Sequence, residues 1–105
     1  MNLVRAAGAL ADPVRIKILA LLANRDAVPQ QCCPSSQLGI CVCDIANNLR
    51  VSQPRVSYHL RILREAGFVS ETPEGRWSHY SLERQLFTQF CDEVLSLAAI
   101  KEDLP

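Results

Sequence analysis

The chain has no long hydrophobic run, few aromatic residues and no net charge. Its apolar stretches are far shorter than the 18 or so residues that a membrane span needs. Charged side chains also interrupt residues 1–22, where a secretory signal would lie. These absences predict a cytoplasmic protein with no membrane partner. A length of 105 residues allows a single domain over residues 1–105, because domains commonly have about 100–150 residues.

The charged residues are distributed unevenly along the chain. The 11 basic and 11 acidic residues cancel, and this balance argues weakly against a nucleic-acid binder. Residues 50–64, however, hold four arginines and no acid, whereas residues 65–105 hold eight of the acids. The sequence therefore concentrates positive charge in one short segment, which becomes the candidate surface for an anionic partner.

Helical periodicity and capping residues predict a mainly α-helical chain with one small β-hairpin. Helices are expected over residues 2–10, 13–23, 44–49, 53–66 and 83–99. Two β-prone runs, residues 68–72 and 76–81, flank Pro73-Glu74-Gly75, which indicates a hairpin. Residues 24–40 carry neither period, so we expect an unusually long loop there.

A short helix, a tight connection at residues 50–52 and a longer helix form a helix-turn-helix, and the hairpin after it is a wing. Val56, Leu60 and Leu63 form the apolar stripe of the longer helix, so its other faces are free to hydrogen-bond bases and phosphates in a major groove. A solvated basic helix face is the alternative. The candidate DNA contacts are Ser52, Gln53, Arg55, Ser57, Tyr58, His59, Arg61 and Arg76. His59 ranks below the others because it lies toward the inner edge of the stripe.

The five cysteines are an odd number in a chain without an export signal. A disulfide framework is therefore not expected, and metal binding, redox chemistry or burial must explain them. Cys91 lies on the apolar stripe of the last predicted helix, where a buried small hydrophobic residue is expected.

Three segments together resemble the ArsR/SmtB family of metal-responsive repressors, and the likeness covers nearly the whole chain. They are Cys-Val-Cys-Asp at residues 41–44, the run from Ser52 to Gly67, and the run from Gly75 to Tyr80. The resemblance implies a winged-helix homodimer, formed through its first and last helices. Such a dimer binds an inverted repeat in double-stranded operator DNA until a toxic ion binds the protein.

The same resemblance places Cys41 and Cys43 in a site for As(III) or Sb(III), with no organic cofactor. The third cysteine of the arsenic-sensing pattern is replaced by Ala46, and the last helix has no histidine for the zinc-type site of the family. We expect Cys32 or Cys33 to supply the third sulfur, since soft ions prefer thiolates and three suffice. Alternatively, the adjacent pair Cys32-Cys33 has no role in ion binding, or it forms a reversible disulfide.

Spacing suggests how an ion would act. Side chains two residues apart point about 200° apart on a helix but the same way in an extended segment. Cys41 and Cys43 can therefore share one ion only if their segment is not helical. If the DNA-binding form winds residues 41–44 into a helix, ion binding must unwind or shift it.

Other functions stay open at this point. A thiol-redox repressor would pair Cys32 or Cys33 with Cys41 or Cys43, and a sensor of a soft divalent ion such as cadmium or lead would use the same thiolates. A cysteine-based reductase is not expected, because no cysteine has an arginine six residues after it.

Overall fold

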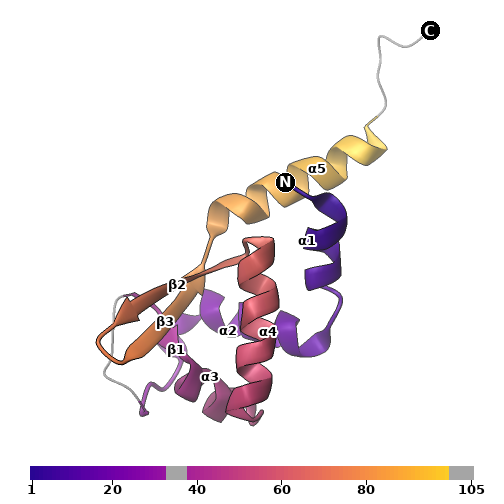
Figure 1. The fold of residues 1–105 in the computed structure, drawn as a ribbon. Coiled ribbons are helices and arrows are strands. Elements are labelled where there is room, and N and C mark those ends of the chain that lie inside the picture. Colours follow the sequence, from indigo (N-terminus) through magenta and orange to yellow (C-terminus); the bar gives the residue numbers. More distant parts are fainter. Residues whose placement is uncertain (33–37, 100–105) are drawn as a thin grey trace, which may run out of the picture.

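The structure, a computed structural model, describes residues 1–32 and 38–99. Within these ranges the elements are α1 (Leu3–Ala9), α2 (Pro13–Ala23), a 3-10 turn (Arg25–Ala27), β1 (Ile40–Cys41), α3 (Val42–Leu49), α4 (Gln53–Ala66), β2 (Val69–Glu74), β3 (Trp77–Leu82) and α5 (Arg84–Ala98). Figure 1 shows α3 at the end of the molecule opposite α5, α4 running from there toward α5, and the β2–β3 hairpin projecting to one side. The predicted helix-turn-helix with a wing is confirmed.

The predicted helix starts follow from local hydrogen bonds. The side chain of Asp12 accepts from the backbone N–H groups of Val14 (2.8 Å) and Arg15 (3.3 Å), and it caps α2. Burial alone would raise the pKa of Asp12, but these two N–H groups bring it below its usual value. Ser52 Oγ caps α4 in the same way, at 3.4 Å from the Arg55 nitrogen. Gly67 ends α4 in the left-handed region, at φ 94°.

The start of α3 and the number of strands differ from the sequence prediction. Helix α3 begins at Val42, two residues before the expected start at Asp44. The hairpin also gains a third strand, because β1 pairs antiparallel with β3 and places Cys41 opposite His79. A two-residue strand is too short to show any period. Gly39 permits this pairing: its φ is +141°, and a Cβ there would lie 2.1 Å from the Tyr80 carbonyl oxygen.

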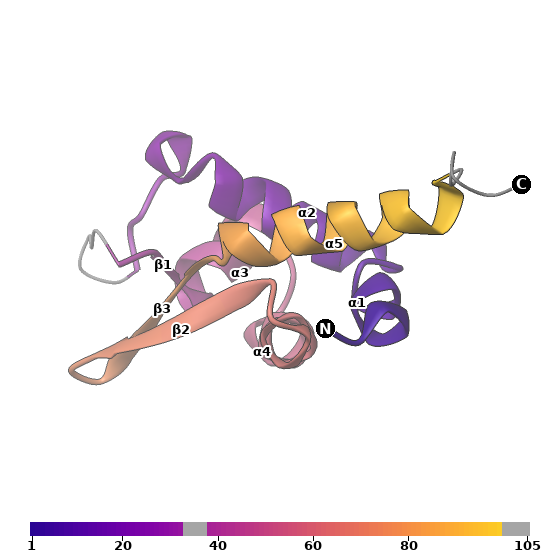
Figure 2. The same ribbon diagram turned by 90° about the horizontal axis from the view of Figure 1, so that it is seen from above.

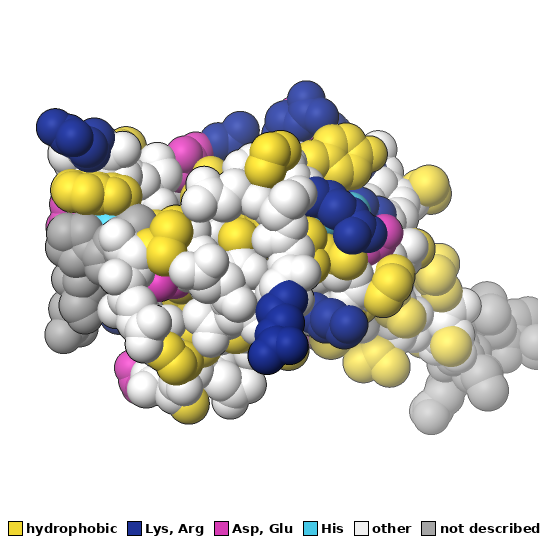
Figure 3. All heavy atoms as spheres, turned by 90° about the horizontal axis from the view of Figure 1, so that it is seen from below, with side chains coloured by type: hydrophobic (Ala, Val, Ile, Leu, Met, Phe, Trp, Pro, Cys, Tyr) yellow, Lys and Arg dark blue, Asp and Glu magenta, His cyan; other side chains and the backbone are white. Residues whose placement is uncertain are grey.

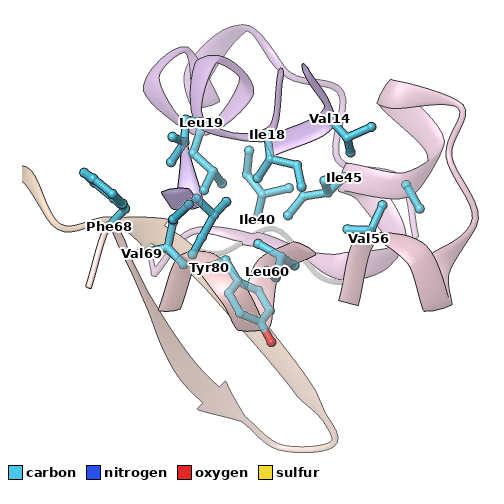
Figure 4. Packing of buried hydrophobic residues seen from close by; sticks show 14 of the residues in the cluster. Val14, Ile18, Leu19, Ile40, Ile45, Val56, Leu60, Phe68, Val69 and Tyr80 are labelled. Carbon is cyan, nitrogen blue, oxygen red and sulfur yellow. The ribbon is translucent and has the colours of Figure 1, made fainter. Parts of the chain in front are cut away.

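The core lies between α2, α3, α4 and the sheet, as Figure 4 shows. Its largest fully buried apolar side chains are Phe68, Ile18, Ile40, Ile45, Leu60, Leu63 and Val56. Each contributes about 1.5–3 kcal/mol to folding through burial. Because Ile45 of α3 and Val56 and Leu60 of α4 are part of this core, any shift of α3 acts directly on the packing of α4.

Helix α5 contacts this core at only one end. The ring of Phe68 lies 4.9 Å from that of Phe87 and 5.8 Å from that of Phe90, measured between centroids. No residue of α5 is buried, and Cys91 is exposed rather than buried as expected. Figures 1 and 2 show α5 crossing the molecule beside α1. Among the helices of the described ranges, none is long and apolar enough to cross a membrane.

Candidate DNA-binding surface and cysteine site

The outer face of α4 carries most of the predicted DNA contacts. Their side chains are exposed: Ser52, Gln53, Arg55, Ser57, Tyr58 and Arg61. Arg76 is exposed as well, next to the turn of the wing at Gly75. Figure 3 views the molecule from the end where α3 and the start of α4 lie, and Lys and Arg side chains are more prominent there than acidic ones. This arrangement suits the polyanionic backbone and the base edges of a major groove.

Two arginines of α4 have partners within the chain. The guanidinium carbon of Arg61 lies 5.7 Å from the centroid of the Tyr58 ring, a cation–π distance. Arg64 forms an ion pair with Glu71 of β2. The hydroxyl of Ser78 lowers the pKa of Glu71, and Arg64 acts in the same direction. The pair therefore ties the end of α4 to the wing.

His59, the lowest-ranked of the predicted DNA contacts, lies inside the protein. Its side chain is buried at 5% exposure, and Nδ1 lies 3.0 Å from a guanidinium nitrogen of Arg15. Burial lowers the pKa of His59, and Arg15 adds to this effect while Asp12 opposes it. A neutral ring accepts from Arg15, which can only donate. His59 therefore links α4 to α2.

The structure brings two of the predicted site cysteines together. Cys32 and Cys43 form a disulfide, with their α-carbons 5.8 Å apart. Cys41 is disulfide-bonded as well, and Cys91 is the free thiol among the cysteines described. Cys33, the other candidate for a third sulfur, lies outside the described residues. The cysteine site in the structure is thus oxidised, and an ion could bind these sulfurs only after reduction.

Cys41 and Cys43 lie on either side of the junction between β1 and α3. Cys41 is the N-cap of α3 in an extended conformation (φ −79°, ψ 160°) and is 3% exposed, whereas Cys43 lies in the first helical turn. His79, which lies opposite Cys41 on β3, is buried, and its Nδ1 lies 3.9 Å from Glu74 Oε1. In the described part of the chain, no group of three His, Cys, Asp or Glu residues is arranged to hold a metal ion.

Three polar residues of α3 near the cysteines were not among the predicted site residues. Asp44, Asn47 and Asn48 all hydrogen-bond to the loop segment 29–32. Asp44 is buried, although it belongs to the Cys-Val-Cys-Asp motif that the sequence singles out. An acid in the first turn of a helix is common because it interacts favourably with the helix dipole, so its sequence position alone does not indicate contacts to a loop.

Comparison with known proteins places the chain among transcription regulators. The arsR family of bacterial regulatory proteins matches residues 40–71, from β1 into the wing. The arsenical resistance operon repressor of Escherichia coli is 40% identical over 74 residues, which cover 70% of this chain and 52% of the repressor. A homolog of the cadmium resistance regulatory protein CadC from Staphylococcus aureus is 30% identical over 93 residues, covering 89% of this chain and 67% of the homolog.

The fold has solved counterparts. A homodimeric winged helix-turn-helix DNA-binding domain from Mycobacterium bovis superposes with a TM-score of 0.63 at 24% identity, covering 90% of this chain and 76% of that domain. The chain matches about half to two thirds of the length of the two curated relatives. All of these proteins are regulators rather than enzymes, as the sequence predicts. The chain therefore belongs to the arsR family of bacterial regulatory proteins.

Proposed function

We propose that the chain is a transcriptional repressor that binds an inverted repeat in operator DNA as a homodimer and is released by As(III) or Sb(III). Arginines and hydrogen-bonding side chains on the outer face of α4 contact the base edges and phosphates of the DNA, and Arg76 of the wing is a further contact. The ion binds the thiolates of Cys41 and Cys43, and Cys32 or Cys33 adds the third sulfur.

The observation that carries the inducer site is the pairing of Cys32 with Cys43. Bonded sulfurs are closer together than two ligands of one ion need to be, so reduction leaves two soft donors within reach of a common ion. Cys41 lies two residues before Cys43, at the same N-terminal end of α3. Sulfur donors suit arsenic, antimony and soft divalent ions far better than hard ions such as Mg²⁺.

The position of these thiols suggests how ion binding would change the affinity of the protein for DNA. Cys41 is extended and Cys43 is helical, so drawing their sulfurs onto one ion must shift the start of α3. Helix α3 packs on α4 through the core, and the turn between them is held by the Val51 N–H bond to the Ala46 carbonyl (3.1 Å). An ion that binds the shifted form better binds the DNA-bound protein more weakly than the free protein. By linkage, the ion then lowers the affinity for DNA by the same factor.

The test is DNA release by ions from the reduced protein. A duplex from the region upstream of the gene is labelled, and its anisotropy is followed while arsenite, antimonite, cadmium or zinc is added. We expect release by arsenite and antimonite at concentrations well below those of zinc. A variant with Cys41→Ser and Cys43→Ser should bind the duplex but stay bound. Release of that variant at the wild-type arsenite concentration would overturn the proposal. If cadmium is the one ion that releases the wild-type protein, the inducer is cadmium rather than As(III) or Sb(III).

A thiol-redox repressor is the second candidate function, and the Cys32–Cys43 disulfide favours it. Oxidation by hydrogen peroxide would join the two thiols with loss of two protons and two electrons, giving two molecules of water. Peroxide without arsenite should then release the duplex, and dithiothreitol should restore binding. Continued binding by the fully oxidised protein would exclude this function, because the disulfide would be compatible with the DNA-bound form.

A further inference from the structure

A buried carboxylate ties the loop that carries Cys32 to the helix that carries Cys43. Asp44 is 1% exposed. Its Oδ1 accepts hydrogen bonds from the backbone N–H groups of Gln31 (2.7 Å) and Cys32 (2.9 Å), and its Oδ2 lies 3.3 Å from Cys41 Sγ. Burying a carboxylate is costly unless hydrogen bonds compensate. The two loop N–H groups supply this compensation, so Asp44 and the loop hold each other in place.

Two amide side chains on the same face of α3 extend this attachment. Asn48 Nδ2 donates to the carbonyl oxygen of Pro29 (3.0 Å), and Asn47 Nδ2 lies 2.7 Å from Cys32 Sγ. Residues 44, 47 and 48 have the i, i+3, i+4 spacing that places side chains on one side of a helix. About one turn of α3 thus holds segment 29–32 at three of its residues.

We propose that Asp44 is a positioning residue for the inducer site, which holds Cys32 against Cys43 in the reduced protein. This inference rests on the proposed function and identifies the residue that positions the third sulfur ligand of the ion. Segment 29–32 lies outside every helix and strand, so ordering it only when the ion binds would cost conformational entropy and oppose binding. The bonds to Asp44 order this segment before the ion arrives, and such preorganisation raises affinity.

The test measures arsenite affinity of the reduced, full-length chain through the ultraviolet absorption of arsenic–thiolate bonds. Asp44→Ala removes both acceptor oxygens and should weaken arsenite binding by about 10- to 100-fold, the usual effect of losing a group that orients a metal ligand. Asp44→Asn retains one acceptor oxygen and should recover part of the loss. Asp26→Ala removes the same charge from an exposed position in the 3-10 turn and is the matched control, with wild-type affinity expected.

A double-mutant cycle separates positioning from general damage to the fold. In a Cys32→Ser background, Asp44→Ala should change arsenite affinity by less than about twofold, because the residue acts through Cys32. DNA affinity without arsenite should also stay within about twofold of wild type. If Asp44→Ala does not fold, Asn48→Ala takes its place in the same cycle, since it removes the bond to Pro29 from a half-buried position. A loss that persists in the Cys32→Ser background, or no loss at all, overturns the inference.

Failure of this inference is distinguishable from failure of the proposed function. If the Cys41→Ser, Cys43→Ser variant still releases DNA on arsenite, the inducer site itself is wrong. If that variant stays bound while Asp44→Ala binds arsenite as wild type does, only the positioning role of Asp44 is wrong.

Discussion

At the scale of single residues, exposure separates the side chains of α4 that can reach DNA from those that hold the helix in place. Gln53, Arg55 and Arg61 are exposed, whereas His59 is buried against Arg15. Arginine contacts to phosphate strengthen binding to every DNA sequence and make it depend on salt. The exposed arginines should therefore show this signature, and His59 should affect stability instead.

We predict that Arg55→Ala weakens operator binding and reduces the slope of log affinity against log salt by about 1, as the loss of one phosphate contact should. Fluorescence anisotropy at several salt concentrations measures both quantities. Arg84→Ala, which removes a similar exposed charge at the start of α5, is the control and should leave the slope unchanged. Equal slopes for Arg55→Ala and wild type would remove Arg55 from the DNA surface.

We predict that His59 makes the fold less stable as the pH falls. Burial lowers the pKa of His59 below its ordinary value of 6.5, so the unfolded chain binds the proton more readily than the folded one. This contribution to stability is complete above the unfolded pKa and is lost as the pH falls toward the folded pKa. Urea unfolding at a series of pH values from 7.5 downward should show the loss, and His59→Asn should lessen it. An identical pH dependence in the variant would contradict the buried neutral ring.

At the scale of elements, the sequence predicts those whose signals are local. Asp12 and Ser52 cap α2 and α4, which begin at the residues predicted from the sequence, and Gly67 ends α4. Strand β1 could not be predicted, because two residues carry no period and its pairing depends on Tyr80, forty positions away. The docking of the loop on α3 depends on bonds from Asp44 to residues 12 and 13 positions earlier, which no local pattern reveals. The ligand roles of the cysteines stay predictions.

We predict that Gly39→Ala separates β1 from β3 and disturbs the cysteine site. Its backbone conformation is strained for any other residue, at a cost of about 1–3 kcal/mol, and the added Cβ would also clash with the Tyr80 carbonyl. Urea unfolding should report the lost stability, and arsenite affinity should fall with it, since Cys41 belongs to β1. Gly8→Ala is the control: nothing lies within 4 Å of its added Cβ, and alanine favours helix α1. A Gly39→Ala variant as stable as wild type would contradict this account of β1.

At the scale of the whole molecule, α1 and α5 leave apolar side chains uncovered in the single chain. Val4 is 83% exposed, Leu95 68% and Leu97 74%. Exposed apolar side chains on neighbouring helices are suited to protein–protein contact, and a second copy of the chain is the partner that the proposed repressor requires. Two copies would also place two α4 helices for the two halves of an inverted repeat.

We predict that Leu95→Glu together with Leu97→Glu converts the dimer to a monomer and weakens operator binding, since burying these carboxylates in the interface is unfavourable. Analytical ultracentrifugation should give the mass of two chains for wild type and of one for the variant. Arg55→Ala serves as the converse control, because it should stay dimeric while binding DNA more weakly. A wild-type chain that is monomeric at the concentrations where it binds DNA would contradict the dimer.

The central claim is that thiols from the loop and from the start of α3 capture one ion. X-ray absorption at the arsenic edge, on the reduced protein loaded with arsenite, counts the sulfur atoms bound to arsenic. The account predicts three sulfurs in the wild type, and two in a variant with Cys32→Ser and Cys33→Ser, where oxygen replaces the third. Three sulfurs in that variant, or fewer than three in the wild type, would contradict it.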